Sequence, residues 1–242
     1  MSIKKIALVT DTHLQEEMPF LSNKEAQQHF DVVLSHIADN AITNIIFCGD
    51  IGSKNSHDSF FNTLQNYSWH IVLGNHDSMA DLADRLQGSQ VSEEWYYYFD
   101  EQGFRYIIMD SSKGNVSRKQ LDWLKNIVED SRFPLLIFIH HPLLKIETTV
   151  DTLYFLENRM DIVHILEKAP TYCTVFCGHY HMNDEQLSGN IRQITTSAVS
   201  YQIQKDAVGV QIDTSTYGYR ILEVFDHSVL THIVKFKSDE SD

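Results

Sequence analysis

The sequence predicts an α/β fold in which two mixed β-sheets pack against each other and helices cover their outer faces. Three observations predict it. Apolar, strand-like runs alternate with amphipathic segments through the first half of the chain, which is typical of parallel strands joined by helical crossovers. A hairpin-like pair of runs follows in the middle, and the C-terminal part consists of successive strand-like runs. Because no Pro/Gly-rich linker interrupts the 242 residues, we expect one domain over residues 1–242.

The first half is expected to contain three strands and two helices. Ser22 and Glu25 have the spacing of a capping box, so a helix is expected to start near Lys24. Apolar residues then recur on one helical face as far as Ile37. A weaker helical pattern covers residues 56–65. The strands are expected at residues 3–10, 44–48 and 69–73.

The second half is expected to contribute the remaining strands and two further helices. Residues 95–99 and 104–110 flank a turn with Gly103 and predict a hairpin. Ser117 and Gln120 form a second capping-box pattern, and another helix is expected at about 159–168. The other strands are expected at residues 135–139, 172–176, 191–195, 208–212, 219–225 and 229–236. Residues 238–242 are expected to form an acidic tail.

Charge and composition exclude several classes of protein. Lys and Arg number 19 against 33 Asp and Glu, and the net charge of −14 disfavours binding to duplex nucleic acid or to an anionic membrane surface. Three cysteines allow at most one disulfide, and no apolar stretch approaches the ~18–20 residues of a membrane span. The N-terminal apolar run is too short for the core of a signal peptide. We therefore expect a cytoplasmic protein.

Polar residues of one chemical kind follow the predicted strands, at the point where each strand ends. These groups are Asp11 and His13, Asp50, Asn75 with His76 and Asp77, His140 with His141, and His179 with His181. Because α/β sheets bind ligands at the carboxyl ends of their strands, we expect the groups to meet in one crevice. Alternate residues of an extended backbone point the same way, so the D-x-H and H-x-H pairs are each expected to aim together. The glycines before Asp50, Asn75 and His179 are expected to permit sharp turns.

These residue types favour a pair of divalent transition metals. Carboxylate, amide and imidazole groups suit ions such as manganese, iron or zinc, and no thiolate is required. Two ions held ~3.5–4 Å apart need one carboxylate that both share. Asp50 is the expected bridge, because it stands alone after a glycine between the two halves of the ligand set.

The motifs, taken together and in order, resemble the signature of the calcineurin-like metallophosphoesterase family. The matching segments are Asp11-x-His13, Gly49-Asp50, Gly74-Asn75-His76-Asp77, His140-His141-Pro142 and Gly178-His179-x-His181. The Asp-Thr-His-Leu start, the His-His-Pro block and Gly218-Tyr219-Arg220 look most like the class III cyclic-nucleotide phosphodiesterase branch. The resemblance implies a four-layer α/β/β/α sandwich and a dinuclear metal site.

The resemblance also implies a role for each motif residue. One metal would be bound by Asp11, His13 and His181, and the other by Asn75, His140 and His179. Asp50 would bridge both ions, and His76 would donate a proton from outside the ligand set. The substrate would be contacted by Asn75, His76 and His181.

The function expected from the resemblance is that of a dinuclear metal-dependent phosphodiesterase. A hydroxide held between the ions would attack the phosphorus of a 3',5'-cyclic nucleotide in line. A glycerophosphodiester or another phosphoester is the alternative substrate, and the acidic charge disfavours a nuclease. A protein without strong catalytic activity is a further alternative, namely a metal-binding interaction module. The complete set of histidines disfavours it. The expected partner is a small-molecule phosphodiester. The sequence leaves the oligomeric state open, with a homodimer as one alternative.

Four neighbouring residues have alternative interpretations. His141 is expected to be structural or to support a ligand, because adjacent residues of an extended strand point to opposite faces. Asp77 is interpreted either as a solvated turn residue or as a carboxylate that orients His76. Tyr96 and Tyr201 are candidates for stacking on a nucleobase.

Overall fold

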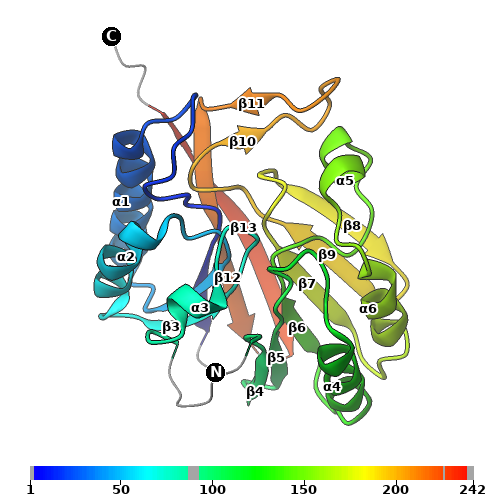
Figure 1. Ribbon diagram of the computed structural model, residues 1–242. Helices are drawn as coiled ribbons and strands as arrows, with labels where there is room; N and C mark the ends of the chain where they lie inside the picture. Colours follow the sequence, from blue (N-terminus) through cyan, green and yellow to red (C-terminus); the bar gives the residue numbers. More distant parts are fainter. Residues whose placement is uncertain (1–2, 87–92, 226, 239–242) are drawn as a thin grey trace.

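The computed structural model describes residues 3–86, 93–225 and 227–238, and its main feature is two β-sheets packed face to face (Figure 1). The first sheet has five strands in the order β13-β12-β1-β2-β3. Its strands are β1 (Lys4–Val9), β2 (Asn44–Cys48), β3 (Ser68–Val72), β12 (Thr216–Phe225) and β13 (Ser228–Lys237). β1, β2 and β3 are parallel, whereas β12 pairs antiparallel with both β1 and β13.

The second sheet has six strands in the order β4-β5-β6-β7-β9-β8. Its strands are β4 (Tyr97–Glu101), β5 (Phe104–Ile108), β6 (Leu135–Phe138), β7 (Cys173–Cys177), β8 (Asp184–Ser188) and β9 (Ile191–Thr195). The four central strands are parallel, and the edge strands β4 and β8 are antiparallel to their neighbours. A separate small hairpin pairs β10 (Gln202–Ile203) with β11 (Ile212–Asp213).

Helices lie on the outer face of each sheet (Figure 1). The first sheet is covered by α1 (Asn23–Asp39) and α2 (His57–Leu64), and the second by α4 (Arg118–Glu129) and α6 (Arg159–Leu166). The connections contain the shorter helices η1 (Lys54–Ser56), α3 (Met79–Leu82) and α5 (Thr149–Tyr154). Both predicted N-caps form, because the Ser22 and Ser117 hydroxyls accept from the backbone N–H groups of Glu25 and Gln120. Within the described residues, none of these helices combines the length and the apolar composition that crossing a membrane requires.

The alternating pattern of β1 explains the layers. Ile6 and Leu8 point between the two sheets, where they pack with apolar residues of the second sheet such as Phe138. Ala7 and Val9 point the other way and pack under α1 and α2. Because neighbouring residues of a strand point to opposite faces, a strand that is apolar on both faces is buried on both. The expected α/β/β/α sandwich of two packed mixed sheets is confirmed.

Of two predictions about the C-terminal part, one is wrong and the other lies mostly outside the described residues. The strand predicted at 208–212 is wrong, because Val208 is 96% exposed and Gly209 has a φ of +81°, which breaks the extended run. Only Ile212 belongs to a strand, the short β11. The predicted acidic tail lies outside the described residues except for Ser238, whose N–H donates to the Ser215 carbonyl at 2.9 Å.

Candidate metal centre

The carboxyl ends of β1, β2, β3, β6 and β7 bring the predicted polar residues together. The Asp50 Oδ2 atom lies 3.2 Å from His140 Nε2 and 3.7 Å from His13 Nε2. The Asp11 Oδ1 atom lies 3.3 Å from His181 Nε2. These loops follow different strands of both sheets, so the centre sits where the two sheets meet.

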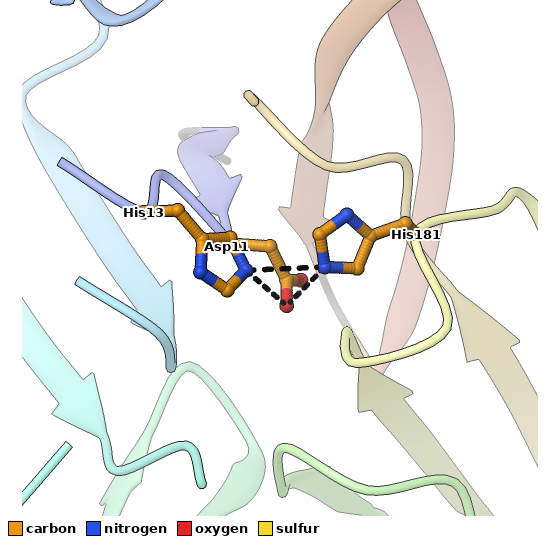
Figure 2. A group of neighbouring side chains, drawn as sticks. All are labelled: Asp11, His13 and His181. Atoms are coloured by element: carbon orange, nitrogen blue, oxygen red, sulfur yellow. Dashed lines mark hydrogen bonds and ion pairs between the residues drawn. The ribbon is translucent and has the colours of Figure 1, made fainter. Parts of the chain in front are cut away.

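The side chains form three overlapping groups whose ligand atoms lie within 4.8 Å of one another. The groups are Asp11 with His13 and His181, Asp50 with His140 and His179, and Asp50 with His13 and His76. Figure 2 shows the first group, in which the Asp11 carboxylate lies between the two imidazole rings. The Asn75 Oδ1 atom joins the second group at 3.2 Å from His140 Nε2. The structure therefore places all eight predicted site residues together, and Asp50 contacts both halves.

Each imidazole ring that belongs to the predicted ligand set is oriented by a hydrogen bond on its outer side. His140 Nδ1 donates to the Cys48 carbonyl at 2.8 Å, and His181 Nδ1 donates to the Tyr201 carbonyl at 3.0 Å. The same arrangement links His179 Nε2 to the Tyr154 carbonyl at 2.9 Å and His13 Nδ1 to Glu16 Oε2 at 3.0 Å. A nitrogen that donates carries a ring proton, so the opposite nitrogen is the one left to bind an ion, once any proton on it has been released. Such outer contacts are typical of metal-binding histidines, and the donor set therefore fits divalent transition metals.

The side chains of the centre do not converge through extended backbone, although the sequence led us to expect it. Five of its residues have a φ in the left-handed region, between +47° and +66°: Asp11, His13, Asp50, His179 and His181. The D-x-H and H-x-H pairs therefore do not aim together through extended backbone. Left-handed backbone is uncommon for residues other than glycine, and such conformations cluster at functional sites.

The three preceding glycines are required mainly for space. Gly49 has a φ of +97°, whereas Gly74 and Gly178 have no positive φ. A Cβ atom on Gly74 would collide with the Asp50 carboxylate, and one on Gly178 would collide with Thr10 and Asp11. Turns are nevertheless present at both: the Gly74 carbonyl accepts from the Asp77 N–H at 3.1 Å, and the Gly178 carbonyl accepts from the Tyr180 N–H at 2.7 Å. These two glycines also let the backbone pass close to a carboxylate.

The carboxylates determine the protonation of the neighbouring rings. Burial opposes the charged form of His140, but Asp50 outweighs it and raises the pKa of His140 to about 10. Burial likewise opposes ionisation of Asp50, but His140 and His13 lower its pKa well below its usual range. The pKa of His179 falls to about 4, because burial and the charge of His140 both disfavour its charged form. An ion that enters this centre therefore replaces protons as the partner of the carboxylates.

Asp77 matches neither of its two interpretations. It is buried rather than solvated, and its carboxylate accepts from the backbone N–H groups of Asp50, Ile51 and Gly74 at 2.8, 3.0 and 2.9 Å. It thereby ties the loop after β2 to the loop after β3. Burial, and then the charge of Asp50, raise the pKa of Asp77 to about 7.

His141 and Tyr201 contact rings of the centre, whereas Tyr96 packs against a tryptophan. His141 is outside the three groups of ligand atoms; its Nδ1 lies 2.8 Å from Ser111 Oγ, and its ring lies 4.1 Å from that of His179. Tyr96 packs against Trp123, with ring centroids 4.7 Å apart. Tyr201 lies beside the centre, with its ring 4.2 Å from that of His181.

Sequence reasoning missed Glu16 and the carbonyls that orient the rings. Glu16 lies three residues after His13, and this spacing is the signal that could have identified it. The Cys48, Tyr154 and Tyr201 carbonyls have no such signal, because every residue carries one.

Comparisons with known proteins point to one family. Residues 5–210 match the model of the calcineurin-like phosphoesterase superfamily domain. The chain is 26% identical over 244 residues to a 3',5'-cyclic adenosine monophosphate phosphodiesterase, CpdA, of Escherichia coli, which covers 94% of this chain and 87% of the relative. It is 24% identical over 235 residues to a 3',5'-cyclic-nucleotide phosphodiesterase of a Nostoc species, covering 91% and 87%.

Among solved structures, a dimetal phosphatase from Danio rerio has a similar fold. Its TM-score is 0.73 at 14% identity, and the match covers 98% of this chain and 99% of that protein. This likeness extends over β12 and β13, which follow the part matched by the family model.

Proposed function

Because the chain belongs to the calcineurin-like phosphoesterase superfamily, we propose that it is a dinuclear metal-dependent phosphodiesterase that hydrolyses 3',5'-cyclic nucleotides. The observation that carries the proposal is the convergence of two carboxylates, an amide and four imidazoles on one point of the structure. The two cyclic-nucleotide phosphodiesterases described above, which align with more than nine tenths of the chain, support the substrate class. We also propose that residues 1–242 act as one domain, since β12 and β13 complete the sheet of β1.

We propose the following ligand sets for the two ions. Asp11, His13 and His181 hold one ion, and Asp50 contributes to both. Asn75, His140 and His179 hold the other. When bound, a pair of divalent ions supplies a water of lowered pKa and neutralises charge on the phosphoryl oxygens. The outward hydrogen bonds of the four rings prepare the chain for this role, because each ring turns its other nitrogen toward the ions.

The proposed proton donor is His76. Its backbone N–H donates to Asp50 Oδ1 at 2.8 Å, which fixes the residue beside the centre, and its ring is 45% exposed. The ion pair with Glu16 outweighs burial and raises the pKa of His76 to about 9. The ring is therefore charged at neutral pH and holds a proton at Nε2. We propose that this proton passes to the departing alkoxide of the ribose, and that Asn75, His76 and His181 contact the substrate.

Metal-loaded protein should hydrolyse a cyclic nucleotide faster than a linear diester such as a glycerophosphodiester, and a phosphomonoester most slowly. The measurement is a panel of initial rates on protein of determined metal content. Protein stripped by a chelator should be inactive and should recover when metal is returned. An Asp11→Ala preparation, purified in parallel, controls for contaminating hydrolases. A panel in which a monoester is the best substrate and cyclic nucleotides are untouched would reject the proposed substrate class.

A further inference from the structure

Glu16 is held next to the centre by contacts between two loops. Leu14, two residues earlier, donates its N–H to the Ile51 carbonyl at 2.9 Å and accepts from the Ser53 N–H at 2.9 Å. Gly52 permits this approach: its φ is +134°, and a Cβ atom there would collide with the Leu14 backbone. The Glu16 N–H donates to the His13 carbonyl at 3.3 Å. The Glu16 side chain, which is 16% exposed, therefore follows a segment that is hydrogen-bonded to the loop after β2.

One oxygen of the Glu16 carboxylate lies between two imidazole rings. Glu16 Oε2 is 3.0 Å from His13 Nδ1 and 3.0 Å from His76 Nδ1. The two rings meet edge to face, with centroids 4.8 Å apart. The carboxylate thus joins a proposed metal ligand to the proposed proton donor through one atom.

This contact determines which nitrogen of each ring faces the centre. A carboxylate oxygen accepts, so both Nδ1 atoms carry a proton. His13 then turns its Nε2 atom toward the centre, where His181 Nε2 lies 3.2 Å away. In His76, Nε2 is left as the nitrogen that can release a proton, and the remaining proton stays at Nδ1 against Glu16. Without this contact the half-exposed ring of His76 would be free to rotate. Ordering the ring for the reaction would then cost conformational entropy.

We propose that Glu16 is a positioning residue that orients the rings of His13 and His76 together, so that one carboxylate supports a metal site and the proton donor. The inference rests on the proposed phosphodiesterase function. A positioning role differs in its effects from a role in which Glu16 only holds the loop in place. Loss of a residue that only holds the loop would lower kcat on every substrate equally and leave the ring tautomers unchanged.

The test compares Glu16→Ala, Glu16→Gln and the control Glu17→Ala, which changes the charge equally at an exposed neighbour. At saturating metal, where weaker binding of the ions is masked, Glu16→Ala should lose ~10–100-fold in kcat on a cyclic nucleotide, which is part of the ~10²–10⁴-fold that a general acid contributes. The loss on a bis-nitrophenyl phosphate should be much smaller, since its leaving group needs no proton. Glu16→Gln keeps an accepting oxygen and should recover part of the loss, and Glu17→Ala should match the wild type. In a His76→Ala background, Glu16→Ala should add little further loss of kcat at saturating metal.

A second readout does not depend on activity. Nitrogen-15 NMR of metal-free protein at alkaline pH, where the ring of His76 is neutral, should show His13 and His76 protonated at Nδ1. Glu16→Ala should give mixed tautomers, while Glu17→Ala should not. Equal losses on both substrates, or unchanged tautomers in Glu16→Ala, would overturn the inference. A wild type that is inactive on every diester would instead reject the proposed function, and the NMR result would still decide the positioning role.

Discussion

Replacing Asp50 by alanine is expected to empty both metal sites and to abolish phosphodiester hydrolysis. The Asp50 carboxylate contacts His140 of one proposed ligand set at 3.2 Å and His13 of the other at 3.7 Å. Its second oxygen accepts from the His76 N–H at 2.8 Å, so the proton donor loses its anchor as well. Elemental analysis after reloading with metal, together with kcat on a cyclic nucleotide, measures both effects.

Asp11→Ala is the matched control, because it also removes a buried carboxylate. Asp11 belongs to the group with His13 and His181 and not to the groups that contain Asp50. We therefore expect Asp11→Ala to empty mainly one site and to leave the second ion bound. If the two variants lose the same amount of metal, the assignment of Asp50 as the shared ligand is wrong.

His76→Ala should keep both ions yet lose activity in a way that depends on the leaving group. A general acid contributes ~10²–10⁴-fold, and its benefit is largest for a leaving oxygen of high pKa. The alkoxide released from a cyclic nucleotide is such a group, whereas nitrophenolate leaves without a proton. The expected loss in kcat is therefore ~10²–10⁴-fold on the cyclic nucleotide and far smaller on a nitrophenyl diester.

The ratio of those two losses separates the proposed role from its rival. If His76 mainly positions the phosphate, both substrates should suffer equally, because positioning does not depend on the leaving group. A ratio near one, measured on protein that retains both ions, would exclude the general-acid role. Metal content must be determined on the same sample, since Asp50 accepts from the His76 backbone.

The location of the candidate site was predictable because it depends on local sequence. A polar motif directly after an apolar strand must lie at the carboxyl end of that strand, and parallel strands bring such ends to one edge. The aiming of the side chains was not predictable in this way. The left-handed backbone at Asp11 and His13 is maintained by contacts with the loop after β2, to residues some 40 positions away in the sequence.

Long-range contacts also explain what was missed in the fold and around the site. β12 pairs with β1 from the other end of the chain, and a pattern of apolar residues cannot specify that partner. β8 is a polar edge strand, so it lacks the apolar run that identifies a strand. Asp77 was misinterpreted for the same reason, since its backbone partners at Asp50 and Ile51 lie on another loop.

The central claim is that two ions share the Asp50 carboxylate, and anomalous X-ray diffraction from crystals of the manganese-loaded protein tests it most directly. We expect two anomalous peaks ~3.5–4 Å apart, the separation used in two-metal hydrolysis. Asp50 oxygens should contact both ions, Asp11, His13 and His181 should surround one, and Asn75, His140 and His179 the other. A single peak, or a second ion that Asp50 does not contact, would contradict the account.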